Sequence, residues 1–128
     1  MRYPRRPTEA SLQAAERRKR EDESLRLQRE VPNLCELSLD LEERTGDATI
    51  VAARHKRHIP VSSAPALFEI QCTDNHCKDG GHDLTWSIMK ALKARVESMN
   101  GEDACTGQLG SSTCRRVLHY TLRAKYTG

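Results

Sequence analysis

Two stretches of the sequence decide the fold that we expect, FEIQCTDNHCKDGGHD at residues 68–83 and CTGQLGSSTC at residues 105–114. Together they contain four of the five cysteines of the chain: Cys72 and Cys77 in the first, Cys105 and Cys114 in the second. The first pair follows a segment that alternates like a strand, and the second pair precedes another such segment. Paired cysteines at the ends of elements are typical of a metal site built by two loops. We therefore expect one metal site to join the two stretches.

Zinc is the metal that this arrangement favours. Structural zinc takes four tetrahedral ligands, with thiolate sulfur about 2.3 Å from the metal. Four residues separate the first cysteine pair and eight separate the second, a longer spacing that Gly107 and Gly110 allow by letting the loop fold back. We assign the zinc to all four thiols, Cys72, Cys77, Cys105 and Cys114. Three alternatives stay open: two disulfides in an exported protein, free thiols in the core, and His82 as a substitute ligand or a hydrogen-bond partner of a thiolate.

The segment between the two stretches has the apolar spacing of a helix. Its large apolar residues recur every three or four positions, at Leu84, Ile88, Met89, Leu92, Val96 and Met99. The pattern predicts a helix from Leu84 to about Asn100, with Asp83 as the N-cap and Asn100-Gly101 as the C-terminal stop. Trp86 lies off this stripe, and we interpret it as a cover over the metal site or the core. The alternative is an exposed anchor for a partner.

Three other segments alternate like half-buried strands. In Leu34–Glu42 the leucines at 37, 39 and 41 share one face, and we expect Cys35 to be a small core residue on that face. Thr45-Gly46-Asp47 predicts a turn to a hairpin partner within residues 48–58. Residues 118–126 predict a last strand with one apolar and one basic face. The fold class is therefore α+β, with an antiparallel sheet of about four strands packed on one amphipathic helix and clamped by the four-cysteine zinc site.

The N-terminal part of the chain differs from the rest. Residues 1–30 contain no glycine, cysteine or histidine and tolerate helix, yet their apolar residues form no continuous stripe. We divide the chain into a charged helical or disordered arm at residues 1–31 and a zinc-stabilised domain at residues 32–128.

Composition limits the location and the partners. The start of the chain carries basic residues with no apolar run after them, and no segment is apolar for long enough to cross a bilayer. We therefore expect a cytoplasmic protein without a membrane partner, in which thiols stay reduced. A net charge of +3 permits nucleic acid or an acidic protein as a partner without requiring either.

The sequence lacks the motifs of the metal enzymes that it could otherwise resemble. Four thiolates close the coordination shell, whereas catalytic zinc keeps an open position. The H-x-E and P-C-x-x-C pattern of zinc deaminases and the H-E-x-x-H pattern of metalloproteases are both absent. We therefore predict that the protein is not an enzyme.

Basic residues provide the candidate binding surfaces. They occur in the arm, in the second strand of the hairpin and near the C-terminus: Arg17, Arg18, Lys19, Arg20, Arg54, His55, Lys56, Arg57, His58, Arg116, Arg123 and Lys125. With only 4 % aromatic residues, contacts to nucleic acid would be mostly to phosphates rather than to stacked bases. We predict a zinc-finger-like module that contacts nucleic acid or a ribonucleoprotein. The alternative is an adaptor that binds another protein through its N-terminal charged helix.

Overall fold

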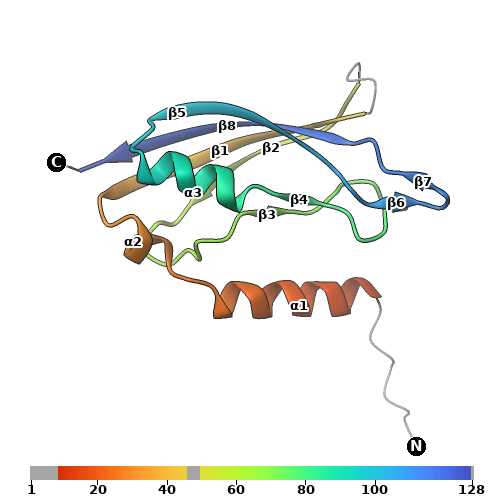
Figure 1. Ribbon diagram of the computed structural model, residues 1–128, viewed down its shortest axis with the longest axis horizontal. Coiled ribbons are helices and arrows are strands. Elements are labelled where there is room, and N and C mark those ends of the chain that lie inside the picture. The colour runs from red at the N-terminus through yellow and green to blue at the C-terminus, as the bar shows by residue number, and fades with distance from the viewer. Residues whose placement is uncertain (1–8, 46–49, 128) are drawn as a thin grey trace, which may run out of the picture.

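Four antiparallel strands form the main sheet, in the order β2-β1-β8-β5 (Figure 1). The computed structural model describes residues 9–45 and 50–127. Two short hairpins, β3/β4 and β6/β7, lie outside this sheet. The elements are α1 (Glu9–Glu23), α2 (Leu27–Glu30), β1 (Leu34–Arg44), β2 (Val51–Ile59), β3 (Glu69–Ile70), β4 (His82–Asp83), α3 (Thr85–Lys93), β5 (Ser98–Ala104), β6 (Gln108–Leu109), β7 (Ser112–Thr113) and β8 (Val117–Tyr126). The predicted α+β class with a four-stranded antiparallel sheet is confirmed.

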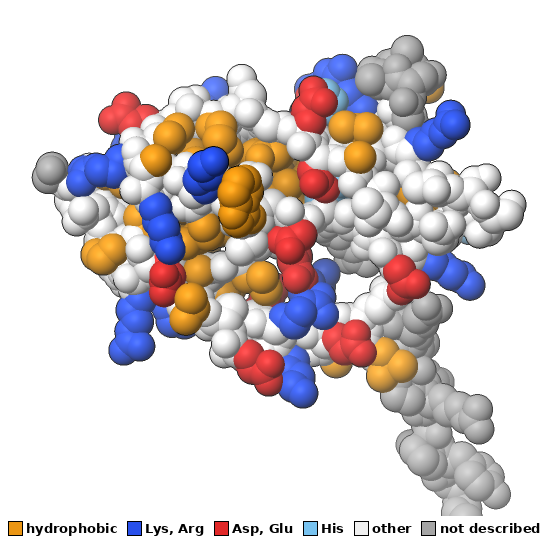
Figure 2. All heavy atoms as spheres, viewed as in Figure 1, with side chains coloured by type: hydrophobic (Ala, Val, Ile, Leu, Met, Phe, Trp, Pro, Cys, Tyr) orange, Lys and Arg blue, Asp and Glu red, His pale blue; other side chains and the backbone are white. Residues whose placement is uncertain are grey.

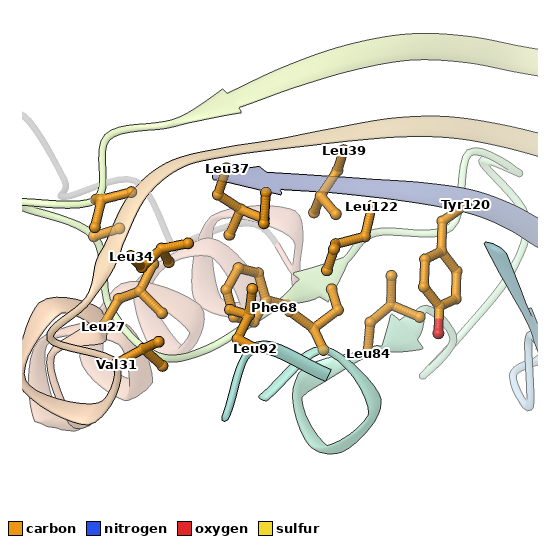
Figure 3. Close-up of a cluster of buried hydrophobic side chains, with 14 of the residues drawn as sticks. Leu27, Val31, Leu34, Leu37, Leu39, Phe68, Leu84, Leu92, Tyr120 and Leu122 are labelled. Atoms are coloured by element: carbon orange, nitrogen blue, oxygen red, sulfur yellow. The ribbon is translucent and has the colours of Figure 1, made fainter. Parts of the chain in front are cut away.

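One face of the sheet carries the core. Leucines of β1 and β8 meet across the ladder, where Leu39 is opposite Leu122 and Leu41 is opposite Tyr120. These side chains point away from the strands toward α3, α2 and the segment around Phe68 (Figure 3). The alternation predicted for both strands is therefore correct, because each strand has a buried face and a solvent face.

Cys35 is an exception to this alternation. The register between β1 and β8 shifts between Leu34 and Glu36, so one extra residue stands in β1 at that point. Such a bulge rotates the residues on either side relative to the regular pleat. Cys35 is exposed as a result, and its predicted place in the core is wrong.

The predicted helix is too long. Helix α3 ends at Lys93, Arg95 adopts a left-handed φ of +59°, and Ser98–Ala104 forms β5. Pairing with β8 explains the change, because it gives this segment backbone partners and places Met99 opposite Leu122. Gly101 lies against the ring of Tyr120, and a Cβ there would lie 2.6 Å from Tyr120 Cε1.

Both ends of α3 differ from the sequence prediction in detail. Leu84 occupies the N-cap position without a side-chain cap, while Asp83 Oδ1 accepts a hydrogen bond from the Thr85 N–H at 3.0 Å. Trp86 is 73 % exposed, so its predicted role as a cover over the core is wrong. The Lys90 ammonium lies 4.8 Å from the centre of the Trp86 ring.

The hairpin of β1 and β2 is antiparallel as predicted. Thr45 N–H donates to the Ile50 carbonyl at 3.0 Å across its end. The predicted turn residues Gly46 and Asp47 lie outside the described residues.

Helix α1 lies outside the core, next to strands β3 and β4 and on their far side from the main sheet (Figure 1). Arg20 makes a bidentate contact with Glu69, and Arg17 donates to Gln71 at 3.3 Å. The chain then enters the core, because Leu27 and Val31 are both buried in it. The boundary between residues 31 and 32 stays a prediction.

None of the helices within the described ranges is long and apolar enough to cross a membrane.

Candidate metal centre

The four thiols of the two stretches meet at one point. The Sγ atoms of Cys72, Cys77, Cys105 and Cys114 all lie within 4.8 Å of one another. Cys77 and Cys105 are separated by 3.6 Å, and Cys72 and Cys114 by 3.9 Å. A tetrahedron with sulfur about 2.3 Å from its centre has edges of about 3.8 Å. The four thiols therefore form a candidate metal site with the dimensions of a tetrahedral centre.

Two loops carry these thiols, and backbone hydrogen bonds join the loops to each other. Lys78 and Gln108 exchange N–H to carbonyl bonds of 2.9 and 2.8 Å. Cys114 N–H donates to the Gly107 carbonyl at 2.7 Å. Strands β3 and β4 pair at the base of the first loop, and the β6/β7 hairpin lies within the second loop, between Cys105 and Cys114. The thiols thus converge on a scaffold in which many backbone groups are already paired.

Two glycines allow the loops to approach this closely. A Cβ on Gly80 would lie 2.6 Å from Cys105 Sγ, and a Cβ on Gly107 would lie 2.6 Å from the Gly80 Cα. No side chain fits at either position unless the thiols move. The sequence predicts Gly107 as a source of loop freedom, whereas the small size of both glycines is the property that the centre uses.

The environments of the thiols differ. Burial raises the pKa of Cys72, and burial together with a hydrogen bond to Cys105 raises the pKa of Cys77 to about 12. Burial acts to raise the pKa of Cys105, but hydrogen bonds from the Gly107 and Gly81 N–H groups, together with those from Cys77 and Cys114, lower it, and the net shift is downward. These donors lie 3.5 and 3.3 Å from Cys105 Sγ. Cys105 is therefore the thiol that the protein best prepares as a thiolate.

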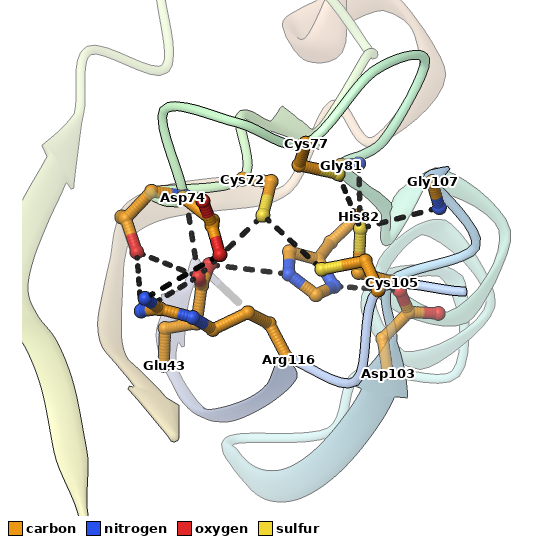
Figure 4. A network of polar contacts seen from close by, with 12 residues as sticks. Glu43, Cys72, Asp74, Cys77, Gly81, His82, Asp103, Cys105, Gly107 and Arg116 are labelled. Carbon is orange, nitrogen blue, oxygen red and sulfur yellow. Dashed lines mark hydrogen bonds and ion pairs between the residues drawn. The ribbon is translucent and has the colours of Figure 1, made fainter. Parts of the chain in front are cut away.

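His82 lies beside the thiols without joining them (Figure 4). Its ring is fully buried, with Nδ1 3.0 Å from Asp103 Oδ2 and Nε2 3.2 Å from Glu43 Oε2. Since both nitrogens face carboxylates, neither is directed at the metal position. His82 thus connects the loop after Cys77 to β1 and β5 instead of replacing a cysteine.

Glu43 is the residue of this centre that the sequence analysis missed. It is 2 % exposed, and its Oε1 accepts hydrogen bonds from Thr73 N–H at 3.1 Å and Thr73 Oγ1 at 2.6 Å. The Cys72 thiol lies 3.7 Å from the same oxygen. The sequence does contain a signal for a buried Glu43, because this residue continues the odd-numbered strand face that Leu37, Leu39 and Leu41 occupy. An acid at a buried position of a strand predicts a paired, functional or structural carboxylate.

Arg116 belongs to this centre as well. Its guanidinium lies 3.6 Å from Glu43 Oε1, 3.1 Å from Thr73 Oγ1 and 3.9 Å from Asp74 Oδ2. The sequence predicts Arg116 as a contact for a nucleic-acid partner. The structure places it in the contacts that support the first cysteine loop.

The other predicted basic residues lie on separate elements. Several already contact acids or amides: Arg54 lies 3.3 Å from Glu42, Lys125 lies 3.3 Å from Glu36, and Arg17 and Arg20 contact Gln71 and Glu69. Within the described ranges, the remaining seven have no ion pair, namely Arg18, Lys19, His55, Lys56, Arg57, His58 and Arg123. Four of these seven are consecutive residues of β2.

Two hollows adjoin the described surface. One of about 700 Å³ lies on the open face of the sheet, where residues of all four main strands line it. The other, of about 940 Å³, lies between α1 and the cysteine loops, and both Cys72 and Cys77 line it. Figure 2 shows the surface hollowed beside α1. The second hollow therefore connects the thiol cluster with solvent.

No family model, curated protein sequence or solved structure matches the chain. Function is therefore inferred from the four thiols and the charged surfaces themselves.

Proposed function

We propose that the protein is a non-enzymatic zinc-binding module. The convergence of four thiols within 4.8 Å carries this proposal. A soft, all-thiolate set at tetrahedral spacing is typical of structural zinc, and four protein ligands leave no coordination position for a substrate. The nearby histidine is held by two carboxylates, so it is not available as a base beside the metal.

Metal content tests the zinc assignment. Elemental analysis and native mass spectrometry of the purified protein are expected to find one zinc ion per chain. The Cys114→Ser variant should lose it, because the thiol of Cys114 is buried within the cluster. Cys35→Ser is the matched control, since Cys35 is exposed and lies outside the cluster. Iron in place of zinc, or equal zinc in both variants, would contradict the assignment.

For the partner, we propose that β2 contacts the phosphates of nucleic acid. This strand is an edge of the main sheet, and it is exposed or half-buried along its whole length. Its residues 54–58 are all basic, and the register directs Arg54, Lys56 and His58 to the open face of the sheet while His55 and Arg57 point to the opposite face. Positive charge on both sides of an exposed edge suits a flexible polyanion that follows the strand.

Salt-dependent binding tests this second part. Mobility-shift titrations with single-stranded RNA and duplex DNA should show affinity that falls steeply as salt rises. Replacing Lys56 and Arg57 by Glu should weaken binding by about tenfold or more. The matched control replaces Lys90 and Lys93 of α3 by Glu, which changes the net charge equally at another surface. Affinity that stays constant over an about fourfold increase in salt would overturn the proposal.

A specific observation also favours the adaptor function. Most of α1 is exposed, and Leu12 on it has 51 % of its surface open to solvent. If this helix binds another protein, deleting residues 1–24 should abolish capture of that protein and leave zinc content unchanged. The deletion stops before Leu27, because that side chain is part of the core. Capture that persists after the deletion would reject the adaptor function.

A further inference from the structure

We propose that the four-thiol cluster is also a site of reversible oxidation, at which Cys77 forms a disulfide with Cys105 and Cys72 forms one with Cys114. This inference uses the same thiols as the proposed zinc site, but it concerns what replaces the metal when the thiols react. The partner of β2 plays no part in it.

The pairing follows from the distances between the sulfurs. All four Sγ atoms lie within 4.8 Å of one another, and two pairs make direct sulfur contacts, Cys77 with Cys105 at 3.6 Å and Cys72 with Cys114 at 3.9 Å. A disulfide bond is about 2.05 Å long, so each pair must close by about 1.5–2 Å. Both bonds would join the first stretch to the second. The oxidised protein would therefore keep the connection between the loops that the metal makes in the reduced protein.

The scaffold favours reaction within the cluster. The paired hydrogen bonds between Lys78 and Gln108 join the loops without involving any sulfur. The bond from Cys114 N–H to Gly107 holds the second loop closed in the same way. Departure of the metal therefore leaves the thiols close together. A sulfur that has reacted has a partner thiol beside it, which favours a disulfide over further oxidation.

Access to solvent sets the order of events. Cys72 and Cys77 are half-buried and line the hollow beside α1, whereas Cys105 and Cys114 are each 3 % exposed. A small oxidant such as hydrogen peroxide therefore reaches Cys72 and Cys77 before the two buried thiols, and the reaction at Cys77 serves as the example. The Cys77 thiol is converted to a sulfenic acid, and the peroxide is reduced to one water. The Cys105 thiol then attacks the sulfenic sulfur, the Sγ–Sγ bond forms, and a second water leaves.

The second pair reacts in the same way with a second peroxide. Starting from four thiolates around a divalent ion, two peroxides and four protons give two disulfides, four waters and the free ion. Each pair of thiolates gives up the two electrons that its peroxide accepts, so the sulfurs are oxidised to the disulfide and the peroxide is reduced to water. An added dithiol reverses the change by thiol–disulfide exchange and restores the ligands.

Mass spectrometry of the full-length, metal-loaded protein tests the proposal. Hydrogen peroxide should release the metal and lower the mass of the chain by four hydrogens, and a dithiol should reverse both changes. Trypsin leaves Cys72 and Cys77 in one peptide and Cys105 and Cys114 in another, because no Lys or Arg lies within either pair. The expected product is therefore a covalent pair of these two peptides. Bonds within one peptide, or sulfinic acid without a disulfide, would overturn it.

Paired variants test the assignment of partners. In a Cys35→Ser background, replacing Cys72 and Cys114 by Ser leaves the proposed pair Cys77 and Cys105. Replacing Cys72 and Cys105 instead leaves Cys77 with Cys114 and is the matched control. The first variant should form its disulfide at least about tenfold faster. Equal rates would reject the pairing, and tandem fragmentation of the oxidised wild-type peptides gives the same information if the variants do not fold.

The outcomes separate this inference from the zinc assignment. Bound zinc that withstands peroxide concentrations that oxidise the exposed Cys35 would refute the oxidation site and leave the zinc module intact. Disulfides with the proposed pairing in a protein that never contains zinc would support the oxidation site and refute the zinc module.

Discussion

The core beneath the leucines of β1 and the centre at the end of the same strand are stabilised by different contacts. In the first region, apolar side chains of the sheet pack on α2, α3 and Phe68 (Figure 3). In the second, the space is filled by two loops, four thiols and the buried contacts of Glu43 and His82 (Figure 4). A single strand serves both regions, since its buried face changes from Leu41 to Glu43.

This difference shows how a small domain with few aromatic residues is completed. The chain has one phenylalanine and one tryptophan, and the tryptophan is exposed. Apolar burial therefore supports only part of the sheet. Polar contacts of the second region cost desolvation energy that a bound metal can offset. The two regions should consequently respond to different treatments.

Removal of the metal should have the largest effect, because structural zinc contributes on the order of 10 kcal/mol in small zinc domains. A strong chelator is expected to reduce amide hydrogen-exchange protection most at Lys78, Gln108 and Cys114 without abolishing it, while the β1–β8 ladder loses less. The pKa of Cys77 is raised to about 12, so protons compete with the metal and its affinity should rise with pH. Uniform loss of protection along the chain would show that the regions are not distinct.

A cavity in the leucine core should have the next largest effect. Leu39→Ala is expected to lower the free energy of unfolding by about 2–5 kcal/mol, because Leu39 is completely buried. A urea titration followed by circular dichroism measures this change in the free energy of unfolding. Zinc content should not change, since Leu39 lies in the apolar region. Leu12→Ala is the control, and its exposed side chain should make the change less than about 0.5 kcal/mol.

Loss of one buried charge should have a smaller effect, confined to the metal end. Glu43→Gln keeps the size of the side chain but removes the carboxylate that faces His82 and Arg116. We expect a loss of about 1–3 kcal/mol in the same urea titration, together with weaker metal retention against a chelator. Glu42→Gln is the matched control, because Glu42 faces the open side and pairs with Arg44 and Arg54. Equal effects of the two variants would contradict the structural role of Glu43.

Local patterns predicted most of the fold correctly. The alternation of β1 and β8 and the proximity of four thiols at the ends of elements are visible in short segments. The failures depend on contacts between distant segments. The end of α3 is determined by pairing of Ser98–Ala104 with β8, and the position of Cys35 by a bulge against the same strand.

The charged residues were harder to predict for the same reason. Arg116 looks like a free basic residue in the sequence, yet in the fold it lies near Glu43, which is distant along the chain. His82 looks like a ligand by its spacing from Cys77, yet two distant carboxylates occupy its ring nitrogens. Composition gives the number of charges, and only the fold shows which of them already have partners.

The exposed position of Trp86 has a practical consequence for spectroscopy. It is the only tryptophan of the chain, it lies on the surface of α3, where hydrophobic and basic side chains gather (Figure 2), and Lys90 stands over its ring. Its fluorescence should already resemble that of a solvated indole in the folded protein. Unfolding should therefore change the emission maximum little, whereas a molecule that covers α3 should shift it to the blue. The intrinsic fluorescence of this protein is a sensor of docking on α3 rather than of folding.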